Sequence, residues 1–497
     1  MADPRHREGA QRAGERAAKN TLVRAVGEIV GKLASLVLFA ALGRKLGESD
    51  LGVFVLALAF LQIASTPVEL GFSRYIVRQV ARDRSSADEL FFNVVALKLA
   101  LSVPVVGGSL VGINLLGYDG RTRETVYVLT AGILLDSFTK TIFSLFTAHE
   151  RGELQAITLI VQRVAAAALG LAALAAGLGV VSIAATYTAG AALGLIQAAV
   201  LTRRHIGVPR WLVDRPGWRR LALVSLPFAI QDVFTALLFR LDAVILSLIG
   251  TEAEVGRYGA AYRLLDSTLF LTYAISGAFI AMYAYLDTDS DPSIQSVFGR
   301  SIKLALVALV PCAAVLAVLA EPISRLFFGA ELEDASGALR LLAPVAVLIG
   351  LVTLASALVA SRRSPVAMGW ITGGMVVLNV VLNVVLIPPY HEEGAAAAML
   401  VTEVVFAGVA MVFAARAVGG QVHWTATLTS PLVAGVAMGV PLVLLRDSLP
   451  LATIAGVAVY ASVFVLVERR VSPGDLRFAR ELVARRLRPL APGRAAP

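Results

Sequence analysis

Ionisable side chains occur inside long apolar runs of this 497-residue chain, at spacings that could build a polar passage for an anion. Arg24, Glu28 and Lys32 follow one another at intervals of four, so a helix would place them on one face. Charge is costly at the centre of a bilayer, and such residues usually face a bundle interior or a water-filled cavity. We therefore predict that this ladder lines a cavity in which Lys32 can meet a phosphate. The alternative is a self-neutralised ladder that only packs helices.

Four more charged residues in the first half are predicted to line the same cavity. Asp136 and Lys140 are four apart in one run, a spacing that favours an ion pair on one helix. Lys98 and Arg163 have no acidic neighbour at helical spacing, so we expect a mobile anion to be their partner. Snorkelling of both side chains towards the membrane surface is the alternative.

The second half carries two close pairs of opposite charge and one isolated acid. Arg240 and Asp242 are two apart, so they point to different sides of a helix. We expect Arg240 to face the central cavity and Asp242 to face into the second half. Arg263 and Asp266 are three apart, which favours a local ion pair near the outer end of their run, and Arg263 is counted among the cavity residues. Glu403 stands alone in its run.

The two halves differ in the sign of these intramembrane charges. Cations outnumber acids in the first half and acids outnumber cations in the second, so the first half is predicted to grip an anionic headgroup. The second half could hold a coupling ion, either a proton or sodium. Its oxygen ligands would come from Asp242, Asn379, Asn383 and Thr402, since hard cations prefer oxygen. Interhelical amide hydrogen bonds are the alternative use of the same side chains. No other cofactor is expected.

The elements that must position these residues are transmembrane helices. The chain is 57% hydrophobic and 16% charged, with short loops and no room for a soluble domain. Its apolar runs, each near the roughly 20 residues that cross a bilayer, number about fourteen. They cover 21–43, 51–72, 91–116, 125–148, 155–177, 180–202, 221–249, 258–286, 301–320, 338–360, 366–388, 394–417, 427–445 and 451–467. The fold class predicted is an all-α polytopic membrane protein.

The runs group into two six-helix halves and a final pair. We predict a basic N-terminus at 1–20, an N-lobe at 21–202, a basic linker at 203–220, a C-lobe at 221–417, two further helices at 427–467 and a basic tail at 468–497. Alternate loops carry roughly four times as many Lys and Arg as the others, which predicts that both termini are cytoplasmic. Within the tail, a basic amphipathic helix on an anionic leaflet is one expectation and a solvated helix the other. Its apolar side would comprise Leu476, Leu482, Val483, Leu487 and Leu490.

Several classes of protein are disfavoured by composition and motifs. The net charge of +9 indicates cytoplasmic loops rather than nucleic-acid binding. Cys312 is the only cysteine, which excludes an intramolecular disulfide. We find no P-loop, zinc spacing or nucleophile elbow, so catalytic residues and enzyme activity are not expected. The longest outer loop, 321–337, holds Glu331, Glu333 and Asp334, which more simply form a solvated face and so argue against a membrane glycosyltransferase or polymerase.

An internal repeat and three sequence blocks carry a resemblance to a known family. The turns around Gly52 and Gly256 share an acidic stretch, an aliphatic–Gly pair and an aromatic two residues later, in equivalent places six runs apart. The blocks are LGRKLGESDLGVF at 42–54, VGRYGAAYRL at 255–264 after Leu241 and Asp242, and LNVVLNVVLIP at 378–388 followed by HEEGAAAA. Together they resemble the multidrug/oligosaccharidyl-lipid/polysaccharide (MOP) exporter superfamily, in its O-antigen and capsular polysaccharide flippase branch.

This resemblance implies two pseudo-twofold six-helix lobes around a central cavity, with two extra C-terminal helices. It implies that an undecaprenyl-diphosphate-linked oligosaccharide is flipped from the inner to the outer leaflet of the bacterial plasma membrane by alternating access. The partners implied are the lipid-linked glycan, anionic lipids and polysaccharide polymerase machinery. Related lipid II flippases place a sodium site on equivalent helices, with a second acid where Asn383 falls here. The rival within the superfamily is a multidrug/cation antiporter, which the cationic first half disfavours.

Overall fold

The computed structural model describes residues 4–207, 214, 217–285, 293–362, 365–419 and 422–474 of the chain. These residues form helices and contain no β-strand, which confirms the predicted fold class. The helices are α1 (Pro4–Glu69), α2 (Phe72–Arg82), α3 (Ala87–Leu115), α4 (Gly120–Ala148), α5 (Gly152–Ala175), α6 (Val180–His205), α7 (Gly217–Ile249), α8 (Glu252–Tyr285), α9 (Ser293–Val318), α10 (Ala320–Phe328), α11 (Ala335–Arg362), α12 (Pro365–Ala417), α13 (Trp424–Leu444) and α14 (Leu449–Val471).

Among the described residues, ten helices are long and apolar enough to cross a membrane, or eleven if the bent helix α7 is one span. Two of them are too long for a single crossing, because about 20 residues suffice. α1 has 66 residues and breaks at Gly47, whose φ of 83° lies in the left-handed region that favours glycine. α12 has 53 residues and breaks at His391. If α7 is counted as one span, α1 and α12 as two spans each, and α8 is added, the total is fourteen, which agrees with the predicted number of about fourteen.

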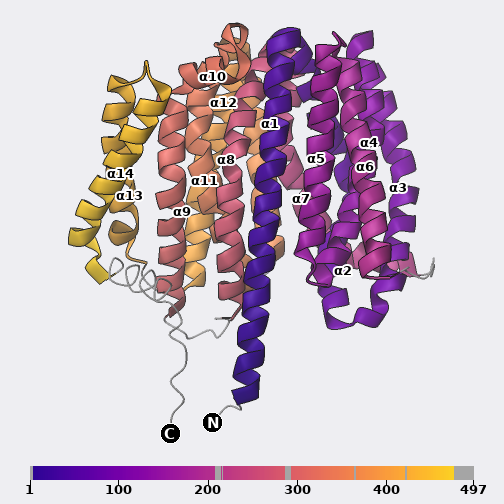
Figure 1. Cartoon of the computed structure of the whole chain (residues 1–497), viewed down its shortest axis with the longest axis horizontal. Coiled ribbons are helices and arrows are strands. Elements are labelled where there is room, and N and C mark those ends of the chain that lie inside the picture. Colours follow the sequence, from indigo (N-terminus) through magenta and orange to yellow (C-terminus); the bar gives the residue numbers. More distant parts are fainter. Residues whose placement is uncertain are drawn as a thin grey trace.

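The chain forms two groups of helices with a third, smaller group at one edge (Figure 1). We call α1–α6 the N-lobe and α7–α12 the C-lobe. α4 packs on α6 and α5 on α1 in the N-lobe, while α11 packs on α8, α9 and α12 in the C-lobe. α1 also runs beside α8 across the lobe boundary. α13 and α14 pack on α9, where Lys303 Nζ lies 2.7 Å from Glu468 Oε1. Much of the predicted basic linker and the predicted tail helix lie outside the described residues.

The two ends of the bundle can be told apart by the start of α1. We call the end where α1 begins the N-terminal face, and the end with the α1 break at Gly47 the far face (Figure 1). The two turns of the predicted repeat meet at the far face. A Cβ on Gly52 would overlap the Glu252 carbonyl oxygen, and one on Gly256 would overlap the Glu48 carbonyl oxygen. The repeat therefore joins the lobes through mutual backbone contact that glycine alone permits.

Two segments expected as loops are helical instead. The arginine-rich stretch after the second span forms α2 at the N-terminal face, where Phe72 and Ile76 are buried on one side while Arg74 and Arg78 are exposed on the other. The helical spacing of these apolar residues is hard to recognise in the sequence, because the segment is short and basic. Arg74 pairs with Asp232 of α7 at 2.7 Å, so α2 contacts the C-lobe. The far-face loop expected to be a solvated face contains α10, which buries Phe328 completely.

Candidate functional site

A cavity of about 420 Å³ lies between the lobes, with walls from α1, α4, α5, α6, α7 and α8. Five of its lining residues are cations and three are acids, so its charge is net positive. The cations are Lys32, Lys140, Arg163, Arg240 and Arg263, and the acids are Glu28, Asp136 and Asp266. Uncharged polar side chains, among them Gln62 and Tyr187, complete the polar lining. Such a wall can replace part of the hydration of a multivalent anion.

The structure brings seven of the nine predicted cavity residues to this one cavity. They are Glu28, Lys32, Asp136, Lys140, Arg163, Arg240 and Arg263. Arg24 lines an adjoining groove instead, and Lys98 lines neither space. That these side chains bind substrate stays a prediction. Gln62, Tyr187 and Asp266 were not among the predicted cavity residues, although each is a polar or aromatic side chain within an apolar run.

Close helix packing explains why the charged ladder of α1 faces the cavity. A Cβ on Gly27 would lie 2.9 Å from the Ala156 Cα, and one on Gly31 would lie 3.3 Å from the Arg163 Cγ. The glycine side of α1 is therefore pressed against α5, as small residues spaced by four permit in membrane helices. The adjacent side, which carries Glu28 and Lys32, is left to face the space between the lobes.

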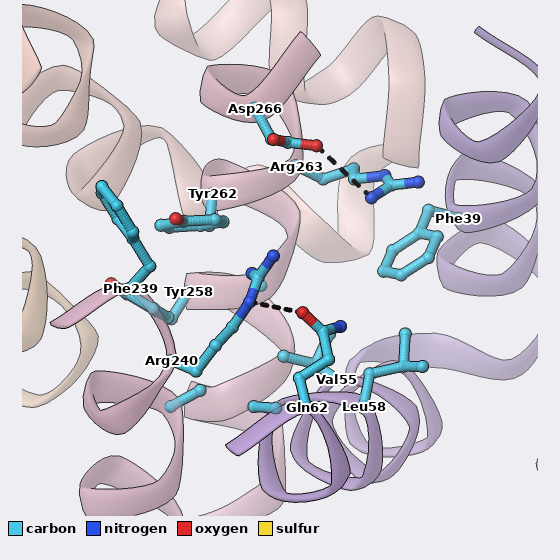
Figure 2. A pocket seen from close by; sticks show the side chains of 13 residues that line it. Phe39, Val55, Leu58, Gln62, Phe239, Arg240, Tyr258, Tyr262, Arg263 and Asp266 are labelled. Carbon is cyan, nitrogen blue, oxygen red and sulfur yellow. Dashed lines mark hydrogen bonds and ion pairs between the residues drawn. The ribbon is translucent and has the colours of Figure 1, made fainter. Parts of the chain in front are cut away.

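Three cavity arginines each lie over an aromatic ring. The guanidinium carbon of Arg263 is 4.3 Å from the centroid of Phe39, and that of Arg240 is 5.3 Å from Tyr262. Figure 2 shows Arg240 also donating from Nε to Gln62 Oε1, a contact of 2.8 Å between α7 and α1. Stacking on a ring holds a guanidinium in place while its N–H edges stay available for bidentate contact with a phosphate.

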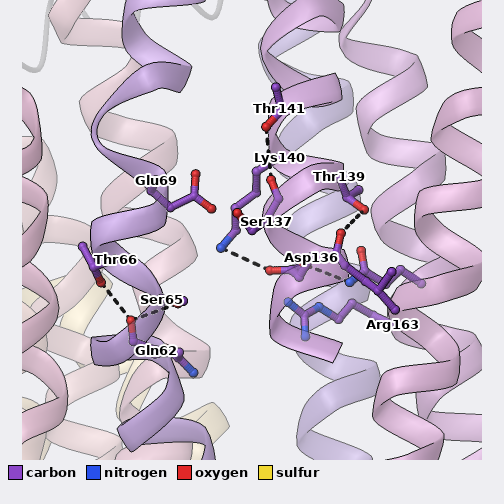
Figure 3. Close-up of polar contacts among 12 residues, drawn as sticks. Gln62, Ser65, Thr66, Glu69, Asp136, Ser137, Thr139, Lys140, Thr141 and Arg163 are labelled. Atoms are coloured by element: carbon purple, nitrogen blue, oxygen red, sulfur yellow. Dashed lines mark hydrogen bonds and ion pairs between the residues drawn. The ribbon is translucent and has the colours of Figure 1, made fainter. Parts of the chain in front are cut away.

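The third arginine contacts its ring through both face and hydroxyl. Arg163 lies 5.5 Å from the centroid of Tyr187 and donates from Nη1 to the Tyr187 hydroxyl at 3.0 Å. Its partner is thus a neutral phenol rather than a carboxylate, and the guanidinium retains its charge towards the cavity. Asp136 and Lys140 form the expected ion pair at 3.1 Å on α4 (Figure 3). Gln162 donates to the same carboxylate at 2.8 Å.

The expectation that Lys98 lacks an acidic partner is wrong. Lys98 is fully buried, and its Nζ lies 2.8 Å from Glu69 Oε2 and 3.0 Å from the Ser137 carbonyl oxygen. Glu69 sits at the end of α1 and is 29 residues away in sequence, so helical spacing could not reveal the pair. Figure 3 shows this end of α1 facing the helix that carries Asp136 and Lys140. Lys98 therefore ties α3 to α1 and α4 instead of lining the cavity.

Asp266 is the acid at the centre of the cationic group. Its Oδ1 accepts from Lys32 Nζ at 2.9 Å, and its Oδ2 lies 3.6 Å from Arg263 Nη1. The expected Arg263–Asp266 pair is present, but its predicted place near the outer end of the helix is wrong. α8 begins at Glu252, before the predicted start at 258, so both residues lie deeper and reach the cavity.

A groove between α1 and α8 adjoins the cavity. It encloses about 480 Å³ and is lined by Arg24, Ala25, Glu28, Lys32, Phe270, Tyr273, Ala274 and Gly277. Glu28 and Lys32 line both spaces, so the groove and the cavity meet at these two side chains. The remaining groove wall on α8 is mostly apolar or aromatic, which suits hydrocarbon rather than a charged group.

The predicted coupling residues form a second polar cluster inside the C-lobe. Asp242 Oδ1 accepts from Asn383 Nδ2 at 2.7 Å, and its Oδ2 accepts from the Tyr258 hydroxyl at 2.8 Å. Asn383 Nδ2 also donates to Asn379 Oδ1 at 3.1 Å. Three of the four predicted residues are therefore in contact, and the expected opposite facing of Arg240 and Asp242 is present. The Thr402 hydroxyl instead donates to the Ala398 carbonyl oxygen of its own helix at 2.7 Å.

Glu403 stands alone in its run of the sequence, but the fold brings it near this cluster. Its side chain is buried and close enough to Asp242 for the two carboxyl groups to interact electrostatically. Neither of its carboxyl oxygens has a hydrogen-bond partner among the described residues, and the same holds for Asn383 Oδ1. Unpaired buried oxygens are costly unless a proton or a cation satisfies them. An acid within an apolar run was the signal that could have identified it.

Comparisons with known proteins agree with this architecture. A relative from Haloferax volcanii, described as a probable low-salt glycan biosynthesis flippase, Agl15, is 22% identical over 404 residues, which is 80% of this chain and 84% of the relative. A structure of the lipid II flippase MurJ in an inward closed conformation aligns with a TM-score of 0.72 at 13% identity, covering 90% of this chain and 99% of that one.

A second fold neighbour is an inward-facing multidrug resistance transporter of the MATE family, which belongs to the MOP superfamily. It aligns with a TM-score of 0.62 at 18% identity, covering 80% of this chain and 98% of the other. The family model for polysaccharide biosynthesis proteins matches residues 17–280. Because that match spans more than half of the chain and the fold agrees with it, this multi-pass membrane protein belongs to the polysaccharide biosynthesis protein family.

Proposed function

We propose that the protein is a flippase that carries a lipid-linked glycan across the membrane by alternating access of its two lobes. One observation carries the proposal, namely a net cationic cavity between the lobes that adjoins a groove between α1 and α8. The printed description of the Haloferax volcanii relative as a probable glycan biosynthesis flippase supports the same activity.

The chemistry of a lipid-linked glycan matches the two spaces. A diphosphate and sugar hydroxyls cannot enter hydrocarbon without losing most of their solvation free energy. Arg163, Arg240 and Arg263 would replace part of that solvation with charge-assisted hydrogen bonds. The lipid chain would remain in the bilayer and in the mostly apolar groove beside α8, so that the headgroup alone crosses through protein.

The proposed substrate is an undecaprenyl-diphosphate-linked oligosaccharide, and the proposed setting is the bacterial cytoplasmic membrane. The excess of Lys and Arg on alternate loops supports placing both termini and the N-terminal face in the cytoplasm. A membrane potential that is negative inside would then assist export by about 2.3 kcal/mol per charge per 100 mV. Polysaccharide polymerase machinery would use the product, and anionic lipids would contact the basic face.

We also propose that the C-lobe cluster couples transport to a proton or sodium gradient. Asp242, Asn379 and Asn383 are in contact, and the unpaired oxygens of Glu403 and Asn383 supply further ligands. Carboxyl and amide oxygens of this kind fit a hard cation, while a buried carboxyl group without a hydrogen-bond partner equally fits a bound proton. Glu403 thus provides a second acid in a cluster where Asn383 carries no charge.

The test is transport of a lipid-linked oligosaccharide in proteoliposomes, read as its appearance in the far leaflet. Arg163→Gln and Arg240→Gln should each lower the initial rate at least tenfold, because each removes a cation from the cavity. Arg325→Gln is the control, since Arg325 is exposed and pairs with Glu333 at the far face. Wild-type rates in both cavity variants would reject the proposal. Export of organic cations without glycan transport would establish the antiporter alternative instead.

A further inference from the structure

The contact between Lys32 and Asp266 crosses the boundary between the lobes. Lys32 on α1 donates from Nζ to Asp266 Oδ1 and to the Asp266 carbonyl oxygen on α8, each at 2.9 Å. The two side chains are mostly enclosed, with 18% and 22% of their surfaces exposed. Two hydrogen bonds from one ammonium group hold α1 and α8 together at this level.

The place of this contact gives it a role beyond packing. Lys32 lines both the lateral groove and the central cavity, whereas Asp266 lines the cavity but not the groove. The ion pair therefore stands at the junction through which a headgroup in the groove would have to pass. Anything moving from the groove to the cavity has to separate Lys32 from Asp266 or pass directly beside them.

Asp266 is held in the way that a bound phosphate would be held. Its two carboxylate oxygens are taken by different cations, Oδ1 by Lys32 and Oδ2 by Arg263 at 3.6 Å. Arg263 is itself fixed against Phe39 (Figure 2). A phosphate oxygen and a carboxylate oxygen compete for the same donors with similar geometry.

We propose that the Lys32–Asp266 pair is a charge-exchange gate between groove and cavity, in which Asp266 occupies the anion site until a diphosphate displaces it. This inference rests on the proposed function and adds how the site selects its ligand. The diphosphate takes over Lys32 and Arg263, the bridge between α1 and α8 is released, and the headgroup enters the cavity. When the headgroup leaves, Asp266 binds both cations again and closes the junction.

The gate would discriminate by ligand charge. Displacing Asp266 from two cations requires a headgroup with more than one negative charge, which a lipid diphosphate has and a phosphodiester lipid lacks. Bulk phospholipids would therefore fill the groove without opening it. A portal that faces the bilayer would in this way remain closed to the most abundant lipids around it.

The experiment uses the full chain in nanodiscs, with the lone cysteine replaced (Cys312→Ser) and spin labels placed on Ala25→Cys and Ala274→Cys across the groove. Farnesyl diphosphate is the probe, and farnesyl monophosphate and phosphatidylglycerol are the comparison ligands. When Lys32 and Asp266 are both kept, we expect farnesyl diphosphate to lengthen the distance between the labels on α1 and α8. Phosphatidylglycerol should leave this distance unchanged.

Asp266→Asn should lengthen that distance without ligand and bind farnesyl diphosphate about tenfold more tightly, because a charged hydrogen-bond competitor has been removed. Lys32→Gln should also widen the groove but weaken binding. Asp447→Asn, at an exposed carboxylate between α13 and α14, is the matched control and should change neither quantity.

The outcomes separate this inference from the proposed function. If Asp266→Asn keeps the short distance, or weakens binding as Lys32→Gln does, the pair is structural and the gate is rejected, while diphosphate binding by the wild type would still support the flippase. If neither the wild type nor Asp266→Asn binds farnesyl diphosphate, the diphosphate substrate is rejected and the exchange step with it.

Discussion

Gly52 and Glu252 contact each other through their backbones, with the α-carbon of Gly52 packed directly against the Glu252 carbonyl oxygen. The equivalent contact, Gly256 against the Glu48 carbonyl oxygen, follows from the repeat. The lobes thus touch at the far face through two small turns, which the proposed alternating access would have to separate.

Gly52→Ala should hold the far face open. A Cβ at this position overlaps the Glu252 carbonyl oxygen, and backbone atoms cannot move aside as a flexible side chain can. We expect labelling of a cysteine in the cavity by an impermeant reagent from the far face to increase, and transport to fall at least tenfold. Gly107→Ala on α3 is the control, because nothing lies within 4 Å of its added Cβ. Unchanged labelling in Gly52→Ala would show that the turns do not close this face.

Two arginines reinforce the same face by bridging the lobes. Arg257 Nη1 lies 2.9 Å from Glu48 Oε2 and its Nε lies 2.5 Å from Glu392 Oε1. Arg121 lies 2.6 Å from Asp50 and 2.5 Å from Glu252, but its side chain is 42% exposed, against 18% for Arg257. Exposed ion pairs contribute about 0–1 kcal/mol, whereas removing one partner of an enclosed pair costs more, because the other charge is left uncompensated.

Arg257→Gln should therefore open the far face more than Arg121→Gln does. The measurement is the same labelling assay, repeated at low and high salt. Salt should screen the Arg121 pairs and leave the Arg257 pairs largely intact. Equal effects of the two substitutions, with equal salt dependence, would contradict this ordering.

Asp119 caps the N-terminus of α4 outside the membrane-spanning segments. Its contribution to the stability of the protein should depend on pH. Burial works against its ionisation, but hydrogen bonds from Thr122 and the charge of Arg121 outweigh this and lower its pKa below the ordinary 3.8. Its stabilising effect is thus fully present above the unfolded pKa and is lost as pH falls through the lower folded value. Asp119→Ala should cost about 1 kcal/mol at neutral pH, and Asp119→Asn less.

Thermal unfolding in detergent between pH 7 and pH 3 measures this difference. The gap in melting temperature between wild type and Asp119→Ala should narrow only at the acid end of the series. A gap that stayed constant to pH 3 would show that the charge of Asp119 does not stabilise the helix.

The buried Lys303–Glu468 pair should determine whether α14 stays docked on α9. The two atoms are 2.7 Å apart, and the Glu468 side chain is only 2% exposed. Glu468→Ala would leave a buried ammonium without this partner, a change that costs about 3–5 kcal/mol. We expect faster proteolysis between α12 and α13. The double substitution Lys303→Met with Glu468→Leu should restore protection, because apolar residues need no partner there.

Glu403→Gln should uncouple transport from the ion gradient proposed to drive it. The substitution removes a buried carboxyl group while keeping its shape, so the fold should persist and the coupling should be lost. In proteoliposomes we expect flipping that no longer responds to an imposed proton or sodium gradient, whichever drives the wild type. Asn379→Asp is the opposite change, adding an acid beside Asn383. An unaltered gradient response in Glu403→Gln would remove this residue from the coupling cluster.

The sequence by itself determined the all-helical membrane fold and most of the charged residues that line the cavity. Runs near the length of a bilayer span can only be helices, because each backbone polar group must be satisfied within the segment. Charges inside those runs must face the interior, which is why Lys32, Arg163 and Arg240 could be assigned to a cavity before the helices were placed. Spacing along one helix also predicted the Asp136–Lys140 pair and the opposite facing of Arg240 and Asp242.

Only the tertiary structure decided which charges meet across helices. Lys98 pairs with Glu69 at a separation of 29 residues, and Lys32 pairs with Asp266 at a separation of 234. Helical periodicity gives the face on which a side chain lies, but not which helix packs against that face or at what height. That packing pairs Lys98 with Glu69, joins Lys32 to Asp266 and brings Glu403 near Asp242. These relationships therefore became visible only in three dimensions.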